Sequence, residues 1–101
     1  MYINDILLQN INKNEDNVFL TITKKPFKYK VCKNGIQPYR YFYEQFIPIN
    51  RIIPFSNIQF AFEERNNIKR VCELSKKKGS IQGPSYVFSL VKDERILKNL
   101  E

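Results

Sequence analysis

The stretch from Phe27 to Lys33, FKYKVCK, alternates between large apolar side chains and lysine or cysteine, and Asn34-Gly35 follows it directly. A period of two places successive side chains on opposite faces of a β-strand. Asn-Gly is the dipeptide most favoured in a two-residue type I′ turn, because both central residues of that turn need a positive φ. The sequence therefore predicts a β-hairpin, and with it an antiparallel sheet.

A loop made of those two residues would set Lys30 opposite Tyr39 and Lys28 opposite Tyr41, all on one face of the hairpin. Lysines neutralise phosphates and tyrosine rings stack on bases, so this face has the composition of a nucleic-acid surface. A second interpretation gives the tyrosines to the edge of the core and uses the lysines to keep a sheet face in water.

The other face of the predicted hairpin is mainly apolar. Its members are Phe27, Tyr29, Val31, Pro38, Arg40 and Phe42. Pro38 has no N–H to donate to a neighbouring strand, so we expect it at an edge or at an irregular position. The aromatic run QPYRYFYEQF at residues 37–46 is thus divided between a core side and a surface side.

The segment before the hairpin predicts a helix and a strand. Residues 3–11 place their apolar side chains near helical spacing, with Asn4 or Asp5 available to cap the start. Residues 18–23, VFLTIT, are rich in β-branched and aromatic side chains and predict a strand. Its alternation puts Val18, Leu20 and Ile22 on one face.

The segment after the hairpin predicts helices. Ser56-Asn57-Ile58-Gln59 matches a capping box and predicts a helix that begins at Ser56 and ends at Lys76 to Gly79, unless Asn66-Asn67 splits it. Pro84 suits the first turn of a further helix. The order of helix, three strands and two or three helices predicts a single α+β domain over residues 1–101.

The net charge of +7 is concentrated in two segments. Residues 24–40 carry six bases and no acid, and residues 65–101 carry a net charge of +5. Residues 1–23 and 41–64 each carry −2. Such basic segments favour a partner with a negative field, most often nucleic acid. The expected phosphate contacts are Lys24, Lys25, Lys28, Lys30, Lys76, Lys77 and Lys78.

The residues expected of an enzyme or a metal site are scarce. The chain has no histidine and only two cysteines, Cys32 and Cys72, which we expect to be reduced. Most carboxylates fall on predicted helices with basic neighbours three or four positions away, which is typical of solvated ion pairs. The three glycines lack the spacing of a phosphate-binding loop. We therefore expect no catalytic residue and no cofactor.

The lysine run at residues 76–78 has two interpretations. Cations in a last helical turn oppose the negative end of the helix dipole, which explains the run without any function. A basic helix end, a short turn and a second helix also have the outline of a helix-turn-helix. In that outline the second helix would turn outward Gln82, Ser85, Tyr86, Ser89 and Lys92.

Four short motifs resemble a loosely defined set of small bacterial domains, found alone or as accessory pieces near restriction and mobile-element proteins. The motifs are Lys25-Pro26-Phe27, Asn34-Gly35, Ile53-Pro54-Phe55-Ser56 with the helix that follows, and the closing run from Gly83 to Val91. The resemblance covers roughly residues 24–96. It implies association with DNA and assigns no catalytic residue.

Together these features predict a small non-catalytic module that binds nucleic acid, with DNA favoured over RNA. The alternative is a protein-interaction or homodimerising accessory domain that uses the aromatic hairpin as an apolar patch. No apolar run has the length of a membrane span, so we expect no membrane partner and a cytoplasmic location.

Overall fold

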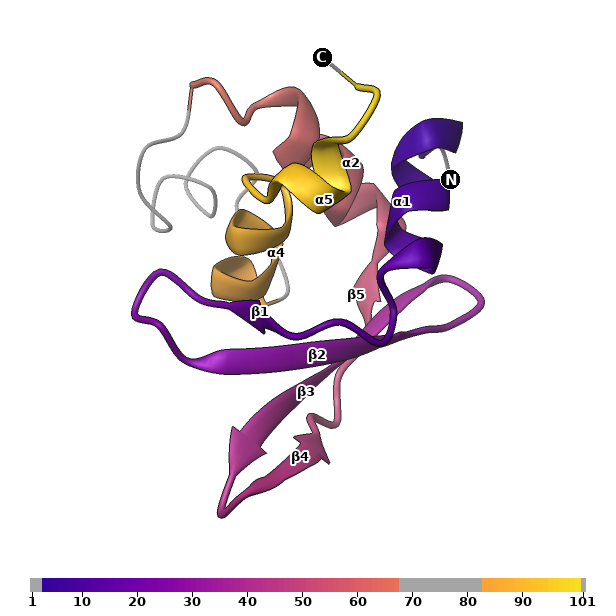
Figure 1. Ribbon diagram of the computed structural model, residues 1–101. Helices are drawn as coiled ribbons and strands as arrows, with labels where there is room; N and C mark the ends of the chain where they lie inside the picture. Colours follow the sequence, from indigo (N-terminus) through magenta and orange to yellow (C-terminus); the bar gives the residue numbers. More distant parts are fainter. Residues whose placement is uncertain (1–2, 68–82, 101) are drawn as a thin grey trace.

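The computed structural model describes residues 3–67 and 83–100 of this chain. It is an α+β fold with a short N-terminal helix, a small antiparallel sheet and C-terminal helices, as the sequence predicts (Figure 1). The elements are α1 (Asp5–Lys13), β1 (Phe19–Leu20), β2 (Pro26–Val31), β3 (Gly35–Phe42), β4 (Gln45–Pro48), β5 (Ile53–Pro54), α2 (Phe55–Glu63), α4 (Pro84–Leu90) and α5 (Glu94–Leu97).

Strand β3 is the centre of the sheet. It pairs with β2 along one edge, and along its other edge with β5 near its start and with β4 near its end. The helices lie together on one side, whereas the β3–β4 hairpin extends away from them (Figure 1). One face of the sheet is therefore covered by helices, and the opposite face is not.

The core lies between the helices and the covered face of the sheet. Burial follows the period of two along β2, where Phe27 and Tyr29 are buried and Lys30 is exposed. The helices add apolar side chains with no exposure at all, among them Leu7, Ile58 and Ile96. Burial of such side chains is the main stabilising contribution to a domain of this size.

The predicted register of the β2–β3 hairpin is wrong by two residues. Lys28 pairs with Tyr39 and Lys30 with Gln37, and the chain reverses at Lys33 and Asn34. Because the shift is even, every side chain keeps its predicted face. Both lysines and Tyr39 therefore stay on one side, as the sequence predicts.

Gly35 is needed for a close approach between strands, and it forms no type I′ turn. Its φ is not positive, and neither is that of Asn34. A Cβ atom at Gly35 would lie 2.0 Å from the carbonyl oxygen of Ile53, a backbone atom of the paired strand β5. Only a residue without a side chain lets β5 pair there.

The positive φ angles of a type I′ turn occur instead in the next hairpin. Tyr43 and Glu44 connect β3 to β4 and have φ of 49° and 62°. Pro38 lies where β3 changes partner from β5 to β4, which is the irregular position expected for it. The Gln37 side-chain amide donates to the Ile49 carbonyl at 3.2 Å, beside the proline that has no N–H to offer.

Strand β1 is shorter than predicted, and of its two residues Phe19 is the buried one. Only Phe19 and Leu20 pair with β2. Phe19 is buried among the core rings, whereas Val18, Leu20 and Ile22 share a face that is 45, 52 and 58% exposed. The alternation was correct, but contact with Phe27 and Tyr29 selected the phenylalanine for burial.

The capping box predicted at Ser56 does not form. Helix α2 begins at Phe55, and no side chain caps its N-terminus. The Gln59 side chain instead accepts a hydrogen bond from the Asn4 backbone N–H at 2.8 Å and donates one to Glu63. The helix ends at Glu63, ahead of the predicted break at Asn66-Asn67.

The predicted starts of the first and last helical segments are confirmed. Asn4 caps α1 by accepting hydrogen bonds from two backbone N–H groups, and Pro84 occupies the first turn of α4. The segment after Pro84 forms two helices, α4 and α5, and the chain between them is not helical up to Asp93. The Asp93 carboxylate caps α5 by accepting from the Arg95 N–H.

Candidate nucleic-acid interface

The uncovered face of the sheet carries a group of lysine and aromatic side chains, called the open face below. Its members are Lys28, Lys30, Tyr39, Tyr41 and Phe46. They come from three adjacent strands, β2, β3 and β4. Alternation within each strand and direct pairing between strands place them on one face, since Lys28 pairs with Tyr39 and Tyr41 pairs with Phe46.

Contacts between neighbouring strands hold the rings of the open face in place. Phe46 pairs directly with Tyr41, and their ring centroids are 5.1 Å apart in an edge-to-face arrangement. The Lys28 ammonium lies 5.4 Å from the centroid of Phe46, within the range of a cation–π contact. Tyr41 remains 46% exposed, so part of its ring is open to a ligand.

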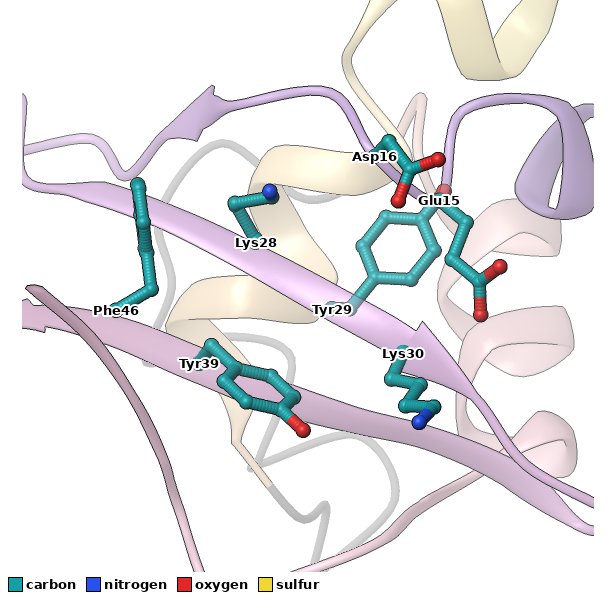
Figure 2. Close-up of a pocket in the computed structure, with 7 residues that line it drawn as sticks. All are labelled: Glu15, Asp16, Lys28, Tyr29, Lys30, Tyr39 and Phe46. Carbon is teal, nitrogen blue, oxygen red and sulfur yellow. The ribbon is translucent and has the colours of Figure 1, made fainter.

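A notch of about 360 Å³ lies at the edge of the open face. Its lining residues are Glu15, Asp16, Lys28, Tyr29, Lys30, Tyr39 and Phe46. Figure 2 shows Glu15 and Asp16 beside the Tyr29 ring, on the opposite side of the notch from Tyr39. The carboxylates come from the loop between α1 and β1, which runs past the part of β2 that β1 does not pair.

Two hydrogen bonds fix the side of the notch next to α1. The Val31 backbone N–H donates to Glu15 Oε2 at 2.6 Å, which fixes the loop against the free edge of β2. The Tyr29 hydroxyl donates to the Ile11 carbonyl oxygen at 2.7 Å. Burial raises the pKa of the Tyr29 phenol, and the nearby charge of Glu15 raises it further. Tyr29 is therefore a neutral, fixed wall at physiological pH.

Other predicted contact residues lie elsewhere. Lys24 is exposed with a positive φ in the loop before β2. Lys25 and Ser85 line a second, wider groove of about 720 Å³ between the sheet and α4, together with Arg40. Lys92 is directed away from both sites, because its ammonium donates to the Arg65 carbonyl oxygen and lies over the Phe88 ring.

The helix-turn-helix interpretation rests largely on residues outside the described ranges. The residues concerned are Lys76, Lys77, Lys78 and Gln82, and Cys72 lies outside the described ranges as well. In the described part, α4 does not present Tyr86 outward, because its ring packs on Phe27 with centroids 4.9 Å apart.

Cys32 is a free cysteine and is half-buried.

Sequence reasoning missed three members of the interface. Phe46 follows the second turn, whose Tyr-Glu sequence gives no hairpin signal, so its pairing with Tyr41 was not foreseen. Glu15 and Asp16 lie in the polar run NKNEDN at residues 12–17, whose composition predicts only a connecting loop. The loop contacts β2 through Glu15 and Val31, a pairing across 16 residues that no local pattern reveals.

No protein-family model, curated protein or solved structure matches this chain. Within residues 3–67 and 83–100, no cluster of three metal-ligating side chains occurs. In the same ranges, none of the helices combines the length and apolarity that crossing a bilayer requires.

Proposed function

We propose that this protein binds single-stranded nucleic acid on the open face, without catalysis. The observation that carries the proposal is the placement of Lys28 and Lys30 beside Tyr39, Tyr41 and Phe46 on the sheet face that the helices leave uncovered. Lysines supply cations for phosphates, and neighbouring rings supply surfaces on which unpaired bases stack. The resemblance to DNA-associated bacterial domains favours DNA over RNA.

The partly exposed rings of the open face argue for a strand with free bases. In a duplex the flat faces of the bases are stacked on one another and out of reach of protein rings, whereas in a single strand they can turn outward. The face is wide enough for more than one nucleotide, because its residues extend over three strands spaced about 4.8 Å apart. The net charge of +7 adds a longer-range attraction for the phosphates.

The test is a fluorescence anisotropy titration of a labelled twelve-nucleotide strand with the whole protein. Lys28→Glu with Lys30→Glu should abolish binding or weaken it at least tenfold, because phosphate contacts become repulsions. For the wild type, the affinity should fall about sevenfold between 50 and 200 mM salt if the two lysines alone contact phosphates, and further if others do.

A matched control carries the same charge change away from the open face. Lys92→Glu with Lys98→Glu alters two exposed lysines at the C-terminal helices, and this variant should retain most of the wild-type affinity. Absence of binding at 50 mM salt would refute the proposal. If both double variants lost the same amount of affinity for the strand, net charge would account for the binding and the open face would not.

A second candidate function, binding of another protein or of a second copy, is favoured by the exposed apolar side chains. Leu20 on β1, Ile22 in the turn after it and Tyr43 at the hairpin tip are 52, 58 and 85% exposed. Size exclusion with light scattering separates the candidates. A dimer that persists at high salt, together with no affinity for nucleic acid, would support this second function. The charge of +7 on each copy opposes such a dimer.

A further inference from the structure

The notch has walls of opposite charge that do not neutralise each other. Glu15 and Asp16 stand on one side, and the Lys28 ammonium faces them from β2, whereas the Lys30 ammonium is directed away from the carboxylates (Figure 2). No ion pair joins these acids to these lysines in the part of the chain that the structure describes. The space between them therefore suits a ligand that carries both hydrogen-bond donors and acceptors on its edges.

The acidic wall has acceptor capacity to spare. Asp16 is exposed, and across residues 3–67 and 83–100 its carboxylate accepts no hydrogen bond. Glu15 uses Oε2 for the Val31 N–H, which holds the loop in position beside the notch. The carboxylate of Asp16 is thus presented by a fixed loop rather than by a free one.

The rest of the notch suits a flat aromatic group. Tyr39 and Phe46 line it, and the neutral Tyr29 ring lies between the carboxylates and the sheet (Figure 2). Its volume of about 360 Å³ is at the small end for ligand sites and is enough for one nucleobase. A base in the notch would continue the stacking surface formed by Tyr41 and Phe46.

We propose that the notch holds one unpaired guanine of the bound strand. Guanine offers two adjacent donors, N1–H and the N2 amino group, which a single carboxylate can accept together, and Asp16 is placed to do so. Its O6 and N7 atoms are acceptors suited to the ammonium group of Lys28, which lies on the same side of β2 as Asp16 (Figure 2). The other bases lack two adjacent donors on that edge. This inference rests on the proposed function, since it concerns one position of the same strand.

The experiment compares strands that differ at a single base. Anisotropy titrations would use ten-nucleotide thymidine strands, with or without one central deoxyguanosine or deoxyinosine, which lacks the N2 amino group. Wild type should bind the guanosine strand about tenfold more tightly than the thymidine strand. The inosine strand should lose most of that gain, because only one donor remains for the carboxylate.

The variants locate the preference in the notch. Asp16→Ala should bind the guanosine and inosine strands equally while keeping the affinity for thymidine. Asp5→Ala removes the same charge at the other end of α1 and should keep the preference. A wild type that binds every strand equally would overturn the guanine inference and leave the proposed function standing, whereas no binding to any strand would overturn both. A preference for guanosine over inosine that survives in Asp16→Ala would also overturn the inference.

Discussion

Tyr29 is more deeply buried than tyrosine usually is. Tyrosine usually lies at the boundary of a core with its hydroxyl in water, but this one is 2% exposed and its hydroxyl donates to the Ile11 carbonyl. That bond connects β2 to α1 across 18 residues of sequence. Burial first, and the charge of Glu15 second, raise the pKa of the phenol. One residue thus serves the core, the helix packing and the wall of the notch.

Tyr29→Phe should lower the free energy of unfolding by about 1 kcal/mol at pH 7, because the Ile11 carbonyl oxygen loses its donor. In the wild type the raised pKa of Tyr29 means that the folded state favours the protonated phenol. This contribution to the free energy of unfolding is complete below about pH 10, the usual pKa of tyrosine, and is lost as the pH rises above it.

Urea unfolding at pH 7 and at pH 10.5 measures both effects. The difference in free energy of unfolding between wild type and Tyr29→Phe should be smaller at the higher pH. The reason is that only the wild type must keep this phenol protonated in order to remain folded. The exposed Tyr43 serves as a control for loss of a tyrosine hydroxyl, since Tyr43→Phe should leave the free energy of unfolding at pH 7 unchanged. A difference that is constant between the two pH values would contradict the role assigned to burial.

At the scale of elements, the β3–β4 hairpin is the strained part of the sheet. Both residues of its turn, Tyr43 and Glu44, have positive φ, a conformation that costs side chains other than Gly, Asn and Asp of the order of 1 kcal/mol each. The Phe42 and Tyr43 rings are in contact, with centroids 4.3 Å apart. The hairpin that carries Phe46 to the open face therefore has an unfavourable turn sequence.

Replacing Tyr43-Glu44 with Asn-Gly should stabilise the protein by about 1 kcal/mol, because that pair fits a type I′ turn without strain. The melting temperature should rise by about 4–8 °C for a domain of this size. Tyr43→Ala is the control, because it removes the ring and keeps a poor turn residue, so the temperature should not rise. A rise in the control equal to that of the double variant would assign the effect to the exposed ring instead.

At the scale of the whole molecule, Asn10 joins the two ends of the chain. It is 6% exposed, and its amide Nδ2 donates to the carbonyl oxygens of Ile96 at 2.8 Å and Lys98 at 2.7 Å. These bonds connect α1 to the end of α5 over more than 80 residues. The N-terminal helix is thereby held against the C-terminal one, and the loop that carries Glu15 and Asp16 follows α1 directly.

Asn10→Ala should lower the free energy of unfolding by about 2–3 kcal/mol, since it leaves two carbonyl groups without their donor in a buried site. Asn12→Ala, on the exposed side of the same helix, should change it by less than about 0.5 kcal/mol. Chemical denaturation of both variants measures the difference. Equal stability of the two variants would show that the helix ends do not depend on this contact.

The sequence determined those features that depend on residues close together in the chain. The period of two in β2 and β3 assigned Lys28, Lys30 and Tyr39 to one face, and an even error in register could not change that assignment. The Asn4 cap and the Pro84 start were predictable for the same reason, because a cap or a first turn involves only the next few residues.

The features that depend on distant segments follow from packing and have no local signal in the sequence. The Ile53 carbonyl oxygen lies so close to Gly35 that no side chain fits there. Phe19 is buried in place of Leu20 because its ring packs on Phe27 and Tyr29. The notch formed because the loop after α1 packs on β2 through Glu15, a contact that no period or propensity encodes. Local patterns set the face of each side chain, whereas packing between segments far apart in the sequence sets which face is buried and where a site opens.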